Sequence, residues 1–199
     1  MMNSVTMRRM DKAVIGSIAA AVGILNYIPY IWSILKGKMR PHAFSWLVWG
    51  VLTGIAFAAQ VTGNGGAGAW VTGTTAIGCF VIFLLALFKG QRAFPLFDWL
   101  SLAGAFLAMA VWWLTKNPLG AVLLVSLVDF LGFLPTFRKG WEKPFEDSTL
   151  LFGVGALKFV IGIFALDTFD LITGFYPLLL IVLNGGFVLI LMFRRMQLK

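Results

Sequence analysis

Four strongly polar side chains lie within apolar stretches of this sequence, where each needs a physical explanation. Two are charged, Asp129 and Lys158, and two are amides, Asn26 and Asn184. Charged and amide groups inside a membrane are costly and often mark solute or ion pathways. Counted at about 1.5 Å per residue from the nearest basic loop, all four fall roughly 12–15 Å deep. The sequence therefore predicts one polar layer near the centre of a bilayer.

The residue types in this layer leave several roles open. Asp129 and Lys158 form a structural ion pair, exchange a proton coupled to transport, or contact a ligand directly. Asn184 and Asn26 bind a solute or hydrogen-bond a neighbouring helix. Thr53 and Cys79 lie at similar depth and are further candidates for substrate binding. Pro29 and Pro135 each remove a backbone hydrogen bond within a predicted helix, and are candidate hinges.

Other chemistries are disfavoured by the residue inventory. The single cysteine excludes an intrachain disulfide, and the single histidine, His42, excludes a His-rich metal site. We find no nucleophile, base and orienting group at suitable spacing, so we expect neither an enzyme nor a cofactor. The sequence also has no nucleotide-binding motif, so ATP is not expected to drive it directly.

The composition points to lipid as the surrounding solvent. The 199 residues are 60% hydrophobic and 12% charged, with a mean hydropathy of +0.91. A soluble protein of this size lacks the interior volume to bury so much apolar surface. The net charge of +8 comes from basic residues between the apolar runs, which is a membrane-topology pattern and does not indicate nucleic acid.

The chain contains seven apolar runs long enough to cross a bilayer as helices. The first follows a basic start like that of a signal peptide, but it is too long for one and no cleavage motif follows. The expected spans are Ala13–Leu35, Ala43–Thr62, Ala67–Phe88, Trp99–Thr115, Pro118–Phe137, Ser148–Leu166 and Leu171–Phe193.

The distribution of basic residues orients these spans. The N-terminus and the loops after spans two, four and six carry few of the 16 basic residues, and the opposite side carries most of them. By the positive-inside rule the N-terminus faces outward and the C-terminus lies in the cytoplasm. The expected location is the plasma or inner membrane, with the chain as a monomer or a homo-oligomer.

Two segments of the sequence are similar to each other. In each, a late-helix proline (Pro29, Pro135) precedes a basic loop, a second proline (Pro41, Pro144), and later a glycine. Spans 1–3 and 5–7 are therefore expected to be copies. Because one intervening helix restores the direction of the chain, the repeats should be parallel. The predicted fold is an all-α integral membrane protein of seven transmembrane helices: a first bundle (13–92), a linker helix (93–116) and a second bundle (117–196).

This 3-1-3 arrangement, with its late-helix proline, basic turn and following Ser/aromatic segment, resembles the PQ-loop and SWEET transporter superfamily. That group includes sugar carriers, nicotinamide riboside (PnuC-type) transporters and, on a similar fold, the KDEL receptors. Here Pro29-Tyr30 and Pro135-Thr136 replace the Pro-Gln dipeptide of the family. The resemblance implies that Asn184 occupies a sugar-contacting position. It also implies that an aromatic at Trp49 stacks on the ligand, although packing alone explains this tryptophan.

The expected function is transport of a small polar solute, such as a sugar or a nucleoside-like vitamin, by alternating access around a central site. Facilitated diffusion is the simplest mechanism, and proton coupling through Asp129 and Lys158 is the alternative. A membrane receptor or sensor of the same fold, which binds a ligand without moving it, is the rival from another class.

Overall fold

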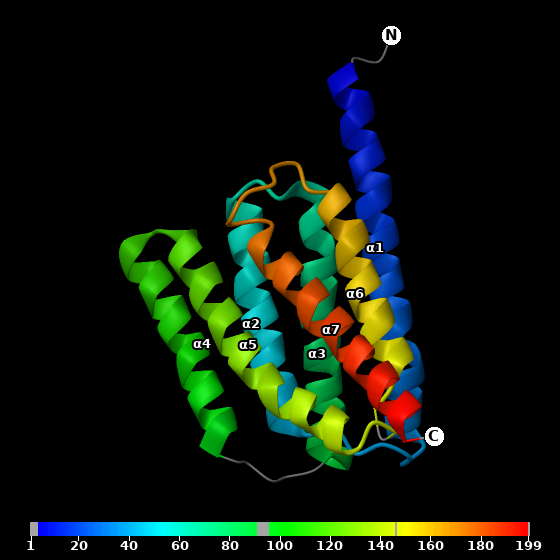
Figure 1. Ribbon diagram of the computed structural model, residues 1–199. Coiled ribbons are helices and arrows are strands. Elements are labelled where there is room, and N and C mark those ends of the chain that lie inside the picture. Colours follow the sequence, from blue (N-terminus) through cyan, green and yellow to red (C-terminus); the bar gives the residue numbers. More distant parts are fainter. Residues whose placement is uncertain (1–3, 91–95, 146, 199) are drawn as a thin grey trace.

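The computed structural model describes residues 4–90, 96–145 and 147–198, and this part of the chain is helical without strands (Figure 1). The elements are α1 (Ser4–Leu35), α2 (Ala43–Thr62), the 3₁₀ helix η1 (Gly66–Ala69), α3 (Trp70–Lys89), α4 (Leu96–Thr115), α5 (Pro118–Glu142), α6 (Thr149–Phe164) and α7 (Phe175–Gln197).

Five segments are long and apolar enough to cross a membrane by length and composition. They are Met10–Leu35 in α1, α2, the segment Gly66–Lys89 that joins η1 and α3, α5, and α7. The helix α6 and the part of α4 from Leu102 are shorter apolar helices. Large apolar side chains also cover the outside of the bundle; Phe88, for example, is 83% exposed. These features fit a multi-pass protein surrounded by lipid.

The helix boundaries differ from the predicted spans where polar residues extend or interrupt a run. At about 1.5 Å per residue, α1 is roughly 48 Å long, more than the hydrocarbon thickness of about 30 Å. Its N-terminal part projects beyond the bundle (Figure 1). At the other end of the chain, α7 begins at Phe175 and not at Leu171. The Asp170 carboxylate accepts the N–H groups of Ile172 and Thr173 at 2.8 and 3.0 Å, which forms a turn before the helix.

The helices pack in two triads, α1–α3 and α5–α7, that share one internal order. In the first triad, α3 packs against both α1 and α2. In the second triad, α7 packs against both α5 and α6. The two triads meet where α1 packs against α6 and α2 packs against α5, while α4 lies at the edge of the bundle against α5 and α2 (Figure 1). The third helix of each triad therefore separates the first from the second.

The two ends of the bundle have different compositions. One end, here called the η1 end, carries η1 and the loop between α6 and α7 (residues 165–174). The other, here called the basic end, carries the loop after α1 with Lys36, Lys38 and Arg40, and the C-terminal Arg194 and Arg195 of α7. Successive helices run between these two ends in alternating directions (Figure 1).

The hydrophobic core is continuous near the η1 end and divided near the basic end. One cluster draws on both triads and on α4; its members from α3, α5 and α7, such as Val71, Val122 and Tyr176, come from the halves of their helices nearer the η1 end, and only along α2, through Phe44 and Val48, does it reach the basic end. Toward the basic end, the first triad has its own cluster around Tyr27, Trp46 and Ile82. The second triad has a separate cluster around Phe133, Leu183, Phe187 and Leu191.

Candidate functional site

Lys158 on α6 is buried at the interface between the triads. The residue is only 3% exposed. The ammonium donates a hydrogen bond to Thr75 Oγ1 on α3 at 2.8 Å. It also lies 5.0 Å from the centre of the Tyr27 ring and 5.1 Å from that of Phe159. Residues of α1, α3 and α6 thus hold one amine in place, partly through cation–π contacts.

A glycine on α1 makes room for this lysine. A Cβ on Gly23 would lie 3.3 Å from Lys158 Cδ and 3.8 Å from its Nζ. The aliphatic stem therefore passes across bare backbone of α1. A side chain at this position would press on the lysine and displace its amine from Thr75.

Asp129 on α5 is 2% exposed and has a different partner. Its Oδ2 accepts a hydrogen bond from the Tyr176 hydroxyl on α7 at 3.0 Å. Both residues belong to the second triad. The contact satisfies the tyrosine hydroxyl, which a buried tyrosine requires, and it gives the carboxylate one donor.

Cys79 on α3 belongs to the surroundings of Lys158, because both residues contact Tyr27. Its Sγ lies 3.9 Å from the Tyr27 hydroxyl. The two buried charges and the polar residues around them are here together called the central polar cluster. It consists of Lys158 with Tyr27, Thr75 and Cys79, and of Asp129 with Tyr176.

The expected direct ion pair between Asp129 and Lys158 is not formed. The ammonium binds Thr75 and the carboxylate binds Tyr176, and no oxygen of Asp129 lies within 4.0 Å of the lysine nitrogen. The expectation assumed that helices consecutive in the chain are neighbours in space. In the structure α7 packs against both α5 and α6 and separates them.

The two asparagines contact α6 at positions nearer the basic end than Lys158, although Asn26 is next to Tyr27 in α1. Asn26 Nδ2 donates to the Leu151 carbonyl on α6 at 3.1 Å. Asn184 Nδ2 donates to Leu180 O within α7 at 2.7 Å, and its Oδ1 lies beside Gly155 of α6. Along α6, positions 151, 155 and 158 share one face and are separated by about 6 and 4.5 Å. The polar groups predicted to lie at one depth are therefore found at three successive levels along α6.

The remaining predicted residues belong to local packing of the first triad or to helix backbones. Trp49 packs edge-on against Trp46 with ring centres 5.3 Å apart. Thr53 Oγ1 donates to the Trp49 carbonyl one turn earlier at 2.6 Å. Neither makes a hydrogen bond or ring contact with the central polar cluster. The proposed hinges lie within helices that continue past them: Pro29 in α1 and Pro135 in α5.

Sequence reasoning missed Tyr27, Thr75 and Tyr176, which surround the two charges. A signal was present, because the chain has only three tyrosines and two of them belong to the cluster. A tyrosine hydroxyl in an apolar run needs a polar partner, so each such residue points to another polar group at its depth. The threonine gave no comparable signal, since threonines in membrane helices commonly bond their own backbone.

Cross-triad hydrogen bonds close the η1 end above the cluster. Gly68 N donates to Ala165 O at 3.0 Å, and Asp167 N donates to Gly65 O at 3.2 Å. Gln60 Nε2 on α2 donates to Thr173 O at 2.7 Å. The backbones approach so closely that a Cβ on Gly68 would lie 2.6 Å from the Leu166 nitrogen. Glycine is therefore required at this position.

Lys12 adds a side-chain bond across the same end. Its ammonium donates to the Leu166 carbonyl at 2.6 Å and lies 3.4 Å from Asp167 Oδ1. Leu166 follows the C-terminus of α6, where carbonyl groups lack helical partners and a cation is favoured. The projecting part of α1 thus binds the loop of the second triad.

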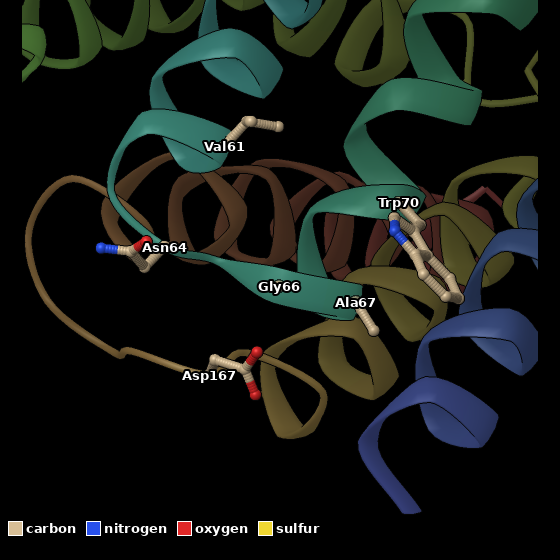
Figure 2. A pocket seen from close by; sticks show the side chains of 6 residues that line it. All are labelled: Val61, Asn64, Gly66, Ala67, Trp70 and Asp167. Carbon is tan, nitrogen blue, oxygen red and sulfur yellow. The ribbon is translucent and has the colours of Figure 1, made fainter. Parts of the chain in front are cut away.

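An open hollow of about 430 Å³ lies at the surface of the η1 end, outside these bonds. Figure 2 shows Asp167 of the α6–α7 loop beside Gly66, with Trp70 on the neighbouring wall. None of the predicted site residues lines it. The lining residues are Val61, Asn64, Gly66, Ala67, Trp70 and Asp167.

Comparison of the chain with models of known families, with curated proteins and with solved structures finds no match. The arrangement of the central polar cluster is therefore the basis on which a function is proposed.

Proposed function

We propose that the chain is a membrane transporter of a small polar solute that is uncharged or zwitterionic. The observation that carries this proposal is the state of Asp129 and Lys158. Both are at least 97% buried, they have opposite charges, and neither neutralises the other by direct contact. A purely structural pair would be expected to form a direct bond, because an unpaired charge inside lipid is costly. Two buried charges that do not contact each other fit a binding site in which the solute supplies the missing polar partners.

The packing of the triads supports a duplicated transporter architecture. In both triads the third helix lies between the first and the second. Between the triads, the first helix of each packs against the second helix of the other, in the contacts α1–α6 and α5–α2. Two parallel repeats related by an axis along the membrane normal would produce this pattern. On this proposal all seven α-helices cross the bilayer, with α4 as the linker, as in the PQ-loop and SWEET superfamily that the sequence resembles.

The mechanism that we propose is alternating access. The triads rock against each other around the central polar cluster, which is exposed to one side of the membrane at a time. The bonds across the η1 end support assigning it as the closed end in this conformation, and the divided core supports assigning the basic end as the one that separates. With the basic end in the cytoplasm, the conformation corresponds to an inward-facing or inward-closing state.

Uptake into proteoliposomes tests the proposal. The panel contains radiolabelled sugars, nucleosides and amino acids, and the comparison is between the wild type and Asp129→Asn. We expect at least one solute to enter with the wild type and its initial rate to fall about tenfold or more in the variant, because the charge is lost from the site.

The matched control is Asp11→Asn, an exposed aspartate on the projecting part of α1 whose replacement should leave uptake unchanged. Folded wild-type protein, shown by labelling to be present in both orientations, that moves no member of the panel would contradict transport. Binding of a solute without flux would favour the receptor or sensor.

A further inference from the structure

The third helix of each triad carries, at the basic end, an exposed phenylalanine followed by a basic residue. In the first triad these are Phe88 and Lys89, the last two residues of α3. In the second triad they are Phe193 and Arg194, near the end of α7. The phenylalanines are 83% and 48% exposed. Both pairs lie near the end of a segment suited to cross a membrane, which is the level where hydrocarbon meets the lipid headgroups.

Each basic residue makes the same kind of contact with the first helix of its own triad. Lys89 Nζ donates to Leu35 O at the C-terminus of α1 at 2.9 Å. Arg194 Nε donates to Trp141 O near the C-terminus of α5 at 3.1 Å. The two acceptors correspond, because each lies six residues after the late-helix proline of its repeat. The triads therefore hold one cation each at equivalent places, where the end of a helix favours positive charge.

These contacts leave most of the hydrogen-bond donors of both side chains unused. An ammonium carries three donors, and among the described residues only Leu35 O accepts from Lys89. A guanidinium carries five donors, and the described residues accept two from Arg194, at Trp141 O and Gln197 Oε1. No carboxylate in the described part of the chain forms an ion pair with either residue. The protein thus positions two positive charges without neutralising them.

This combination fits an anionic phospholipid. A phosphate diester is negatively charged and has several acceptor oxygens, so it binds basic side chains through charge-assisted hydrogen bonds. The exposed ring one residue earlier lies at the depth of the acyl chains, where it adds apolar contact. In phosphatidylcholine the choline cation neutralises the phosphate, whereas phosphatidylglycerol has no cation and keeps a net negative charge. Basic residues at the membrane surface therefore favour the anionic lipid.

We infer that each triad has one binding site for an anionic phospholipid, in the leaflet at the basic end. The phosphate binds Lys89 in the first site and Arg194 in the second. An acyl chain lies on Phe88 and on Phe193, respectively. Each lipid contacts the third helix where that helix meets the first helix of the same triad, so it stabilises the triad without tying the two triads together. The inference requires insertion in a bilayer and does not depend on transport.

A third cation of the basic end provides the matched control. Arg138 Nε donates to Glu142 Oε1 at 2.8 Å, so a carboxylate of the protein already neutralises it. Arg138→Gln removes one positive charge from the same end, as Lys89→Gln and Arg194→Gln do. A general effect of net charge would therefore appear equally in all three variants, whereas loss of a site would appear only in the last two.

The first experiment counts the lipids that the purified wild-type protein retains in native mass spectrometry. The detergent is supplemented with phosphatidylglycerol or phosphatidylcholine of the same acyl chains. We expect two molecules of phosphatidylglycerol per chain, each bound about fivefold more tightly than phosphatidylcholine, the effect of one basic residue at a membrane surface. Glycerol phosphate at the same concentration should displace neither. Equal binding of the two lipids overturns the inference, as does displacement by glycerol phosphate, which would assign the sites to a soluble anion.

The second experiment assigns the two sites with the same measurement. Lys89→Gln and Arg194→Gln should each reduce the bound phosphatidylglycerol from two molecules to one, and the double variant should retain none. Arg138→Gln should retain both molecules. Lys89→Arg and Arg194→Lys, which keep the charge, should retain both as well. Retention of two molecules by the double variant overturns the inference.

Thermal unfolding separates lipid binding from a purely structural role of the two bonds. Each basic residue also bonds a carbonyl at the end of a helix, so its loss can lower the melting temperature in any lipid. The measured quantity is therefore the rise in melting temperature when phosphatidylglycerol replaces phosphatidylcholine, compared within one variant. We expect the same rise in the wild type and in Arg138→Gln, and none in the Lys89→Gln/Arg194→Gln protein. A rise equal to that of the wild type in the double variant would mean that both residues act on the helix ends alone, and it overturns the inference.

Discussion

The two ends of the bundle hold the same two triads together in different ways. At the η1 end, a shared core and backbone hydrogen bonds such as Gly68 to Ala165 join the triads. Toward the basic end, each triad packs around its own aromatic cluster, with Trp46 in one and Phe187 in the other. Backbone bonds between glycine-rich segments tolerate little displacement, whereas two self-contained clusters can move apart without exposing their interiors. On the proposed mechanism, this difference favours the η1 end as the closed end and the basic end as the one that opens, where Asn26 still donates to the Leu151 carbonyl across the triads.

Locking the η1 end should have the largest effect. A Cβ on Gly63 would lie 2.9 Å from Ile172 Cγ2, so cysteines at these positions, one from each triad, are close enough for a disulfide. The single native cysteine, Cys79, is 3% exposed and is kept because it belongs to the central polar cluster; we expect oxidation of the Gly63→Cys/Ile172→Cys protein to abolish uptake and reduction to restore it. Uptake and gel mobility are the measurements.

The matched control for this lock is at the basic end. Trp49→Cys with Phe152→Cys joins residues that pack in the separate clusters of the two triads. We expect no spontaneous disulfide there in the resting protein. Full uptake by the oxidised Gly63→Cys/Ile172→Cys protein would show that the η1 end need not open.

Removing the close approach at the η1 end should have the next largest effect. Gly68→Ala places a Cβ against the Leu166 backbone, which cannot move aside as a flexible side chain can. We expect a loss of about 1–3 kcal/mol in unfolding free energy, the usual cost of overpacking, measured by thermal or denaturant unfolding in detergent. Gly54→Ala, where nothing lies within 4 Å of the added Cβ, is the control. Equal stability of the two variants would contradict the tight contact.

Loss of the Lys12 bond should loosen the η1 end only slightly. The Lys12 and Asp167 side chains are 31% and 43% exposed, and such ion pairs contribute about 1 kcal/mol or less. In a Cys79→Ser background, we expect Lys12→Gln to speed maleimide labelling of a Thr173→Cys reporter about two- to fivefold. Asp11→Asn should leave the labelling rate unchanged. An unchanged rate in Lys12→Gln would mean that the backbone bonds alone keep this end closed.

The smallest effect concerns the turn before α7. The pKa of the Asp170 carboxyl is below its ordinary value because the Thr173 and Ile172 N–H groups donate to it. A lowered pKa stabilises the fold above the unfolded pKa of about 4, and this contribution is lost as the pH falls through the folded pKa. Asp170→Ala should therefore lower the melting temperature slightly at pH 7, with the difference from wild type shrinking toward pH 3. Asp170→Asn, which keeps an acceptor oxygen, should lose less.

The sequence anticipated most helix positions because they depend on local features. The bounds of α2 match the predicted span, Ala43–Thr62, since Pro41 and the glycines after Thr62 limit the apolar run on both sides. The start of α7 was placed four residues too early. The turn formed by Asp170 lies among apolar residues, so hydropathy does not reveal it.

The central site was anticipated only in part. Burial of Asp129, Lys158 and Cys79 follows from their positions within long apolar runs. Their partners do not, because Tyr176 is 47 positions from Asp129 and Thr75 is 83 positions from Lys158 in the chain. The direct ion pair, one of the roles that the sequence left open for Asp129 and Lys158, is absent for the same reason, and the two asparagines contact α6 nearer the basic end than Lys158.

By itself, the sequence determined that this is an all-helical chain with several helices suited to lipid, and that charged groups lie within them. Those properties depend on apolar length and on the position of charges along the chain. Only the tertiary structure decided that α7 separates α5 from α6, that Lys158 faces Gly23 and Thr75, and that one end of the bundle is bonded while the other is divided. These depend on which helix faces pack together, and packing between distant segments is not encoded in the local pattern of any one helix.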